Sequence, residues 1–225
     1  MTIAERWREV RAAVDAACLA AGRAPSEVTI VAVSKLHPPA ALEEALAAGA
    51  TDLGENYAQE LVGKQAVVGG APRWHFIGRL QRNKARLVAG KVALIHAVDS
   101  VELGAELGRR AAALGTVQAV LAAINVGGEA QKTGVDPTAA AALVDGLRAC
   151  AGVRLDGLMT MPPPVDDPED VRPAFRALRD LRDRLATAAS PLPQLSMGMS
   201  SDFAVAIACG ATLVRIGTAI FGPRP

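Results

Sequence analysis

The sequence contains few of the residues that form metal centres and disulfide frameworks. Its three cysteines and three histidines are scattered over 225 residues, without a Cys-x-x-Cys pair or a His-x-x-x-His spacing. Zinc and related metals need several such ligands close together, so no metal site is expected. An odd number of well-separated cysteines favours structural thiols in a reducing compartment.

A strong net charge and long apolar segments are also lacking. The 24 lysines and arginines nearly balance the 23 aspartates and glutamates, which gives no electrostatic footprint for nucleic acid or for an acidic membrane surface. No run approaches the roughly 18 apolar residues of a membrane-spanning helix. Residues 1–23 carry charges throughout, unlike a signal peptide. We therefore expect a cytoplasmic protein that binds neither nucleic acid nor membrane.

What the sequence does contain is an amphipathic segment followed by a regular alternation. Apolar residues at spacings of three or four predict an N-terminal helix, and Gly22 ends it. These residues are Ile3, Trp7, Val10, Val14 and Cys18. Eight short apolar runs follow, at residues 29–35, 51–56, 73–78, 94–100, 118–126, 154–161, 193–200 and 212–219. Between them, Ala- and Leu-rich stretches predict helices at residues 39–48, 58–67, 83–88, 101–114, 137–149 and 171–188, with another from about 202.

Apolar strands separated by helices indicate a parallel sheet that is covered by helices. Eight such units predict an α/β protein with one (β/α)₈ (TIM) barrel domain over residues 1–225, to which the N-terminal helix is an addition. A doubly wound open sheet is the alternative, although about six strands usually suffice there. The first strand–helix turn lacks a Gly-x-Gly-x-x-Gly sequence, which argues against a dinucleotide-binding unit.

In such a barrel the carboxyl ends of the strands form the active site, and two of these ends are distinctive here. Gly198, Ser200 and Ser201 come just before the helix predicted from about residue 202, while Gly217 and Thr218 follow the last strand. Hydroxyls, glycine N–H groups and a helix N-terminus at one place form an anion site. Barrels often bind a phosphate after strands 7 and 8. Alternatively, the serines only cap a helix and Gly217 only turns the chain.

Lys35 ends the first apolar run, and closure of the barrel would place it beside the eighth strand. The residues alone leave three interpretations open. The lysine is solvated at an element boundary, or it pairs with the anion as a point charge, or it forms a Schiff base with an aldehyde that is held by its phosphate.

Eight sequence blocks occur in the order found in one known family: VAVSKLHP, GENYAQE, WHFIGRLQRNK, VDS, KTGV, GLMTM, LSMGMSSDF and VRIGTAIFG. Over essentially its whole length the chain resembles the pyridoxal phosphate homeostasis proteins (YggS/PROSC type). The resemblance implies a barrel of fold-type III that binds pyridoxal 5′-phosphate (PLP) and is similar to the N-terminal domain of alanine racemase. It also implies that the protein buffers PLP and delivers it to apo-enzymes.

The resemblance assigns cofactor contacts to nine residues: Lys35, Asn56, His75, Met199, Ser200, Ser201, Arg215, Gly217 and Thr218. Lys35 would form the Schiff base, and the two serines with residues 217 and 218 would hold the phosphate. Arg215 would face the pyridine nitrogen. Asn56 would lie near the ring and its 3-hydroxyl, while Met199 and His75 would form walls. Arg79 and Thr133 fall at positions that vary among the family's motifs and that touch none of these contacts.

The implied site favours a bound but weakly activated cofactor. An arginine donates hydrogen bonds only, so Arg215 would keep the pyridine nitrogen unprotonated and would weaken the ring as an electron sink. Alanine racemase takes a tyrosine base from a second domain, whereas Tyr57 is the one tyrosine here and no second domain is expected after the barrel. We therefore expect an open site, no catalytic residues, no dedicated turnover and a monomer.

Two enzymatic alternatives stay open. One is a PLP-dependent amino-acid racemase or lyase, and the other is a Schiff-base aldolase or isomerase that acts on a sugar phosphate without PLP. A basic cluster also has two interpretations; it consists of Arg79, Arg82, Lys84 and Arg86. It is either a solvated helix start at the barrel rim or a set of charges that steers phosphate-bearing ligands to the site.

Overall fold

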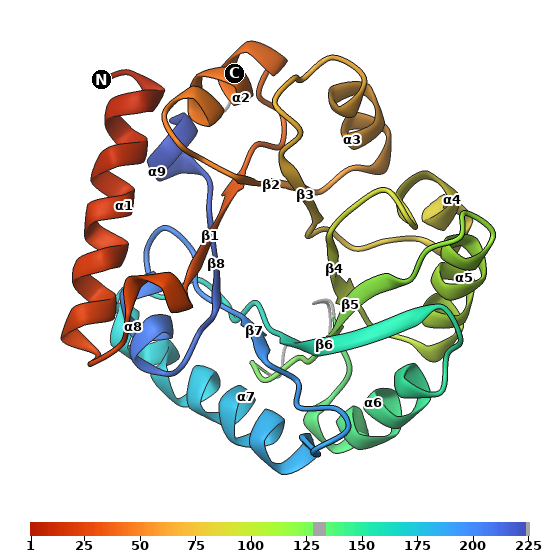
Figure 1. The fold of residues 1–225 in the computed structure, drawn as a ribbon. Helices are drawn as coiled ribbons and strands as arrows, with labels where there is room; N and C mark the ends of the chain where they lie inside the picture. The colour runs from red at the N-terminus through yellow and green to blue at the C-terminus, as the bar shows by residue number, and fades with distance from the viewer. Residues whose placement is uncertain (128–133, 224–225) are drawn as a thin grey trace.

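Eight parallel strands form a closed barrel, and helices surround it (Figure 1). The computed structural model describes residues 1–127 and 134–223. The strands are β1 Thr29–Val33, β2 Asp52–Glu55, β3 Arg73–Phe76, β4 Leu94–Val98, β5 Gln118–Ala123, β6 Val153–Met159, β7 Gln194–Ser196 and β8 Leu213–Ile216. The α-helices are α1 Ile3–Ala20, α2 Pro39–Ala47, α3 Ala58–Gln65, α4 Ala85–Val88, α5 Val101–Ala112, α6 Ala140–Arg148, α7 Arg172–Leu185, α8 Phe203–Ala208 and α9 Thr218–Phe221.

Closure of the barrel depends on the pairing of β1 with β8. Val31 lies opposite Arg215 and Ala32 lies opposite Ile216, in parallel register. The strand order around the barrel is the order along the chain. The predicted (β/α)₈ barrel is therefore confirmed, and the doubly wound open sheet is excluded. Closure also brings the carboxyl end of β1 next to the carboxyl end of β8.

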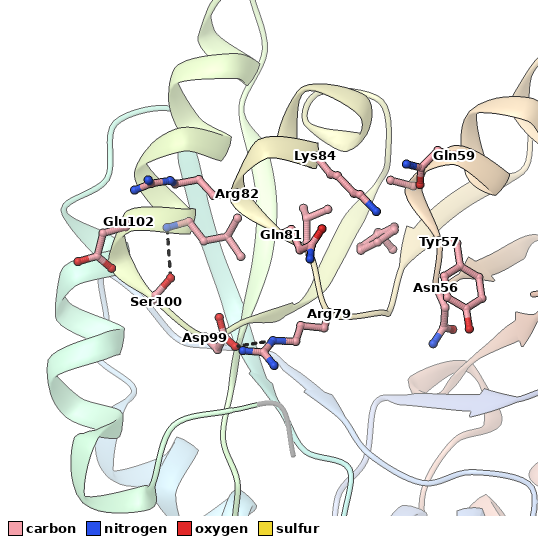
Figure 2. A pocket seen from close by; sticks show the side chains of 14 residues that line it. Asn56, Tyr57, Gln59, Arg79, Gln81, Arg82, Lys84, Asp99, Ser100 and Glu102 are labelled. Atoms are coloured by element: carbon pink, nitrogen blue, oxygen red, sulfur yellow. Dashed lines mark hydrogen bonds and ion pairs between the residues drawn. The ribbon is translucent and has the colours of Figure 1, made fainter. Parts of the chain in front are cut away.

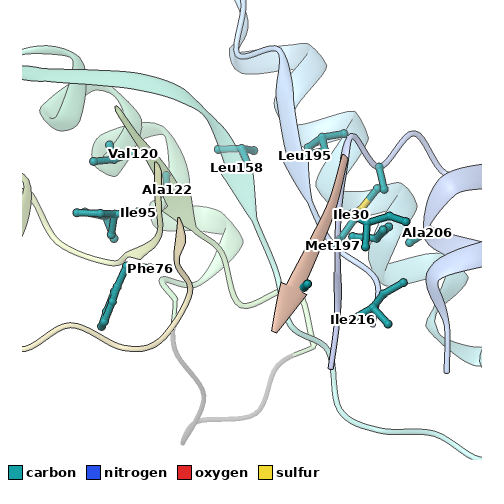
Figure 3. Close-up of a cluster of buried hydrophobic side chains, with 14 of the residues drawn as sticks. Ile30, Phe76, Ile95, Val120, Ala122, Leu158, Leu195, Met197, Ala206 and Ile216 are labelled. Carbon is teal, nitrogen blue, oxygen red and sulfur yellow. The ribbon is translucent and has the colours of Figure 1, made fainter. Parts of the chain in front are cut away.

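Strand side chains alternate between the two faces of the barrel wall. Residues such as Ile30, Phe76 and Leu158 belong to the large apolar cluster between the strands and the helices, where Ala206 of α8 joins them (Figure 3). A second, smaller cluster consists of strand residues whose side chains point to the other face of the wall, and it fills part of the barrel interior: Val31, Leu94, Ala97, Ala119, Leu121, Met159 and Leu213. The rest of the interior carries polar side chains, which are described below.

The additional N-terminal helix α1 braces the end of the barrel wall. Thr2 and Glu5 form a capping box at its start. Its buried face packs against α8 and α9 through Trp7, Val10, Val14 and Cys18. Arg6 donates hydrogen bonds to the carbonyl oxygens of Ile220 (2.7 Å) and Phe221 (3.3 Å). Because α9 directly follows β8, α1 supports the segment that lines the cavity described below.

Several helix limits differ from those that the sequence predicts. Short 3₁₀ turns, at Arg82–Lys84, Pro137–Ala139 and Pro168–Val171, come before α4, α6 and α7. The second and third of these turns begin with a proline, which suits a helix start because the N–H that proline lacks would have no intrahelical partner there. Helix α7 ends at Leu185 because Ala186 is extended, with φ −66° and ψ 142°. Lys132 and Thr133 of the KTGV block lie outside the described residues.

None of the described helices is long and apolar enough to cross a membrane. Among residues 1–127 and 134–223, no three histidine, cysteine, aspartate or glutamate side chains are grouped in a way that could hold a metal ion. The three cysteines carry unpaired thiols, and Cys18 and Cys209 are buried.

Candidate functional site

A cavity of about 380 Å³ lies at the carboxyl ends of the strands, on the face that the fold predicts for function. Its volume is within the range of small-molecule sites, roughly 300–1,000 Å³. Eight of the nine predicted site residues line it: Lys35, Asn56, Met199, Ser200, Ser201, Arg215, Gly217 and Thr218. We refer to it as the main cavity.

Lys35 reaches the main cavity because residues along a strand alternate in direction. Val33 and Lys35 both line the cavity, whereas Ser34 between them is fully buried. The chain turns directly afterwards, where the N–H of His37 donates to the Ser34 carbonyl oxygen at 3.1 Å. Leu36 takes a φ of +66° in this turn.

A buried ionic cluster lies under the Lys35 turn. The Lys64 ammonium group, 5% exposed, donates to a carboxylate oxygen of Glu55 and to one of Glu60, each at 2.7 Å. The Ser34 hydroxyl donates to the same oxygen of Glu55 at 2.6 Å. Burial raises the pKa of Glu55, although the hydrogen bonds from Lys64 and Ser34 act in the opposite direction. Sequence analysis missed this ionic cluster.

The loops after β7 and β8 supply the groups that suit an anion. Ser200, Ser201 and Thr218 bring hydroxyls to the main cavity. The Met199 N–H donates to the Asp202 carboxylate at 2.5 Å, which fixes the loop after β7. Helices α8 and α9 are only six and four residues long. Helix α8 begins at Phe203, close to the predicted start near residue 202, and α9 begins at Thr218. The site therefore offers hydroxyls and the backbone N–H groups of two short helix starts to an anion.

Arg215 enters the main cavity from β8 with its guanidinium fixed. One terminal nitrogen donates to the Ser196 hydroxyl at 2.5 Å, and the other donates to the Thr160 carbonyl oxygen at 2.9 Å. Burial lowers the pKa of Arg215 to about 10, and Asp202 opposes this effect. The guanidinium therefore stays charged at neutral pH and has donors only.

A chain of buried polar side chains continues from Arg215 through the barrel interior. Nδ1 of His96 lies 2.8 Å from the Ser196 hydroxyl, and its Nε2 lies 2.9 Å from Nδ1 of His75. Nε2 of His75 lies 2.8 Å from a carboxylate oxygen of Asp52. We call Ser196, His96, His75 and Asp52 the interior chain. It connects the guanidinium in the main cavity with the amino end of β2.

The hydrogens in the interior chain can be assigned from its two ends. Asp52 accepts, so Nε2 of His75 donates to it. With both rings neutral, Nδ1 of His75 then accepts from Nε2–H of His96, and Nδ1 of His96 accepts from the Ser196 hydroxyl. That hydroxyl oxygen in turn accepts from Arg215. Burial, with His75 and Arg215 nearby, lowers the pKa of His96 well below its usual value, which agrees with a neutral ring.

His75 is the one predicted site residue that does not line the main cavity among the described residues. Ile77, two residues nearer the carboxyl end of β3, lines it instead. His75 is fully buried one layer deeper in the barrel, in the interior chain. The structure thus places His75 behind the wall of the main cavity, with His96 and Asp52 as its hydrogen-bond partners.

Asn56 lies between the main cavity and a second cavity of about 770 Å³, which we call the side cavity. The Oδ1 atom of Asn56 is buried and accepts no hydrogen bond from the described residues. In Figure 2, Lys84 and Gln81 extend from the segment after β3, and Asn56 and Tyr57 lie across from them. The orphan oxygen is thus placed where a ligand group can donate to it.

The side cavity also contains most of the predicted basic cluster. Arg79, Arg82 and Lys84 line it, whereas Arg86 is not among its lining residues. Arg79 is mostly exposed and lies 3.9 Å from the Asp99 carboxylate (Figure 2). These cations therefore surround a cavity that shares Asn56 with the main cavity, and charges there can act on an approaching anion.

The residues of the main cavity fit a ligand that combines an aldehyde with an anionic group. Lys35 brings an amine to one side, the hydroxyls of the β7 and β8 loops serve the anion, and Arg215 supplies donors to a ring acceptor. Asn56 adds a side-chain amide whose Oδ1 has no hydrogen-bond partner among the described residues. Such a set of groups matches PLP, whose aldehyde, phosphate, pyridine nitrogen and 3-hydroxyl need these partners.

Known proteins match the chain over its full length. The family model "Alanine racemase, N-terminal domain" matches residues 9–225. The pyridoxal phosphate homeostasis proteins of Aquifex aeolicus (strain VF5) and Escherichia coli (strain K12) are 45% and 40% identical to it. These matches cover 100% and 99% of this chain, and 99% and 97% of the relatives.

Solved structures show the same fold. PipY of Synechococcus elongatus PCC7942, with PLP bound, has a TM-score of 0.84 at 36% identity, with 98% of this chain and 100% of that chain covered. Alanine racemase from Corynebacterium glutamicum shares the fold at 18% identity, with a TM-score of 0.73, and the match covers 98% of this chain and 61% of that one. The chain belongs to the pyridoxal phosphate homeostasis protein family, whose barrel has the fold of the alanine racemase N-terminal domain.

Proposed function

We propose that this protein binds PLP in the main cavity, holds it as a Schiff base on Lys35, and buffers or delivers the cofactor without a dedicated turnover of its own. The observation that carries the proposal is the position of Lys35, whose cavity also holds Ser200, Thr218 and Arg215. PipY, which is 36% identical, has a solved structure with PLP bound. PLP supplies an aldehyde; the lysine amine adds to its carbon, a C=N bond forms, and the aldehyde oxygen leaves as water.

The protein's own groups divide the work of binding. The hydroxyls of Ser200, Ser201 and Thr218 donate to the phosphate, and Asn56 Oδ1 accepts from the ring hydroxyl. Arg215 donates to the pyridine nitrogen, and Ser196 and Thr160 hold its guanidinium in place. Because the guanidinium stays charged, it gives the nitrogen no proton, and the ring remains a weak electron sink.

The position of Tyr57 supports the absence of turnover. It is the single tyrosine of the sequence, and it lines the side cavity, 52% exposed. A tyrosine base in the main cavity is therefore not available from this chain. A cofactor that is held and exposed on one side suits exchange with apo-enzymes.

Replacement of Lys35 by alanine tests the proposal. The wild-type protein, incubated with PLP and then reduced with borohydride, should gain the mass of one phosphopyridoxyl group and lose its visible absorbance. The Lys35→Ala variant should gain no such mass and should fail to hold PLP for transfer to an apo-enzyme. Lys91→Ala, which removes an exposed lysine elsewhere, is the matched control and should behave like the wild type. Full covalent labelling of Lys35→Ala would refute the assignment.

A racemase or lyase is the second candidate, because the side cavity leaves space for an amino acid next to Asn56. Incubation of the PLP-loaded protein with single amino acids, followed by chiral chromatography, separates the two functions. Conversion of any amino acid at several turnovers per second would replace the buffering function with an enzymatic one. A single domain over residues 1–225, a monomer, and a cytoplasmic location stay predictions, and sedimentation of the loaded protein tests the monomer.

A further inference from the structure

The turn that carries Lys35 has a conformation that needs support. Leu36 lies in the left-handed region, with φ +66°, at the third position of the tight turn from Ser34 to His37. Glycine or asparagine normally takes this position, because a branched side chain meets the backbone there. Leu36 is 49% exposed, so packing of its side chain does not fix the turn.

The support comes from the ionic cluster, through the two peptide groups on either side of the Lys35 Cα atom. The carbonyl oxygen of Ser34, in the peptide group before Lys35, accepts from the Lys64 ammonium at 2.7 Å. The N–H of Leu36, in the peptide group after it, donates to Glu60 at 2.6 Å. Fixing both peptide planes fixes the backbone dihedral angles of Lys35 and hence the direction of its Cα–Cβ bond.

The cluster is itself rigid. The Lys64 ammonium has three donors, and its three acceptors are Ser34 O, Glu55 and Glu60, each at 2.7 Å. Lys64 and Glu60 are one helical turn apart on α3, and Glu55 is fully buried at the end of β2. The turn is therefore tied to one strand and one helix of the barrel wall.

We propose that Glu60 and Lys64 are positioning residues for Lys35: they hold the Lys35 turn so that the amine points into the main cavity at the place where the aldehyde binds. The inference rests on the proposed function and adds to it two residues that do not touch the cofactor. Holding the amine in its reactive direction before the ligand arrives removes the cost of ordering the turn from the condensation.

Glu60 provides the sharper test. Its side chain is partly exposed, and after its loss the buried Lys64 ammonium still pairs with Glu55. Glu60→Ala removes the acceptor for the Leu36 N–H. Glu60→Gln keeps an acceptor oxygen at the same position. Glu43→Ala, at an exposed glutamate on the neighbouring helix α2, is the matched control.

Two ligands separate the turn from the rest of the site. Titration with PLP, followed by the Schiff-base absorbance and by borohydride trapping, measures condensation. Titration with pyridoxine 5′-phosphate, which has a hydroxymethyl group in place of the aldehyde, measures binding to the phosphate and ring contacts alone. Thermal unfolding without ligand shows whether each variant is folded.

Glu60→Ala should bind pyridoxine 5′-phosphate like the wild type but should form the Schiff base about ten-fold less favourably, which is the loss expected for one hydrogen bond to a charged group. Glu60→Gln should recover most of this loss, and Glu43→Ala should show none. Unchanged condensation in a folded Glu60→Ala protein would overturn the inference. An equal loss for both ligands would also overturn it, because the effect would then lie in the cavity as a whole.

These outcomes differ from a failure of the proposed function itself. If Lys35 is not the Schiff-base lysine, Lys35→Ala is labelled by PLP and borohydride as fully as the wild type, whatever the Glu60 variants show. If Lys35 is that lysine and the Glu60 variants differ from each other only with PLP, both statements hold.

Discussion

Two buried polar networks begin on opposite faces of β2. One fixes a side chain in the main cavity, and the other fixes the backbone around Lys35. Asp52 points into the barrel and starts the interior chain, which ends at the side chain of Arg215. Glu55, three residues later, points to the helical layer and joins the ionic cluster, which ends at the backbone around Lys35. One network orients a guanidinium through a hydroxyl and two imidazole rings that lead to a carboxylate. The other orients a strand end through an ammonium group and two carboxylates.

The two carboxylates also respond differently to burial. Burial raises the pKa of Asp52, but the hydrogen bonds from His75 and Thr51 outweigh it, so the pKa lies below its usual value. Burial raises the pKa of Glu55 as well, and there the Lys64 and Ser34 bonds do not compensate fully. A buried acid with a salt bridge can thus still have a raised pKa, because the effect of burial can exceed the opposing effect of its partners.

The largest effect is expected from breaking the ionic cluster. Lys64→Met leaves the fully buried Glu55 without its cation and should lower the free energy of unfolding by about 3–5 kcal/mol. The double variant Lys64→Met/Glu55→Gln, which leaves no buried charge, should regain most of this loss. Urea unfolding without ligand measures both. A single variant as stable as the wild type would show that the cluster does not act as a unit.

Breaking the interior chain at Ser196 should cost less, because the group that is removed is a neutral hydroxyl and no buried charge loses its ionic partner. Ser196→Ala takes away an acceptor from Arg215 and a donor from His96, and should lower the free energy of unfolding by about 1–3 kcal/mol. It should also weaken the binding of pyridoxine 5′-phosphate, since the guanidinium loses its direction. Ser26→Ala, at an exposed serine that lines neither cavity, should leave both the stability and the binding unchanged and serves as the control.

The pH dependence of stability should have opposite signs for the two carboxylates. The folded protein binds a proton at Glu55 more tightly than the unfolded chain, so the Glu55 contribution is lost as the pH rises from about 4.5 through the raised pKa. The contribution of Asp52 is present above about pH 3.8 and is lost as the pH falls through its lowered pKa. The free energy of unfolding should be measured between pH 3 and 8 for the wild type and two variants. Glu55→Gln should differ from the wild type in its slope above about pH 4, and Asp52→Asn should differ below it.

The smallest effect is expected from the cations of the side cavity, which are not part of either buried network. If Arg82 and Lys84 steer the ligand, Arg82→Ala/Lys84→Ala should slow PLP loading about two- to five-fold at low salt, and the difference should disappear at high salt. Lys91→Ala/Arg154→Ala removes the same charge from the amino-terminal side of the strands and is the control. Equal loading rates for the two double variants would leave these cations as solvated surface residues.

The sequence predicts the parts of this protein that depend on local pattern. Alternation of apolar runs and helices was sufficient for the barrel. Strand ends pointed to Lys35 and to the loops after β7 and β8, whereas the full set of nine site residues came from the family resemblance. The position of His75 behind the cavity wall could not be predicted, because a strand pattern shows which face a side chain takes, but the depth of each layer depends on the stagger of all eight strands. Lys64 was missed because a single lysine on a helix is usually solvated. It nevertheless lies three residues after Leu61, which lies three after Ala58, and this spacing places it on the buried face of α3.

The contact between Arg6 and Ile220 links residues 214 positions apart. Helix α1 comes before all the strands in the chain, yet the surface on which its buried face packs is formed by α8 and α9, which come after β7 and β8. Contacts of such long range slow folding, because the whole chain must be ordered before they form. The main cavity, which takes residues from both β1 and β8, exists only after this final step. A cofactor that binds there selects molecules in which the barrel has closed, and it holds them in that state by mass action.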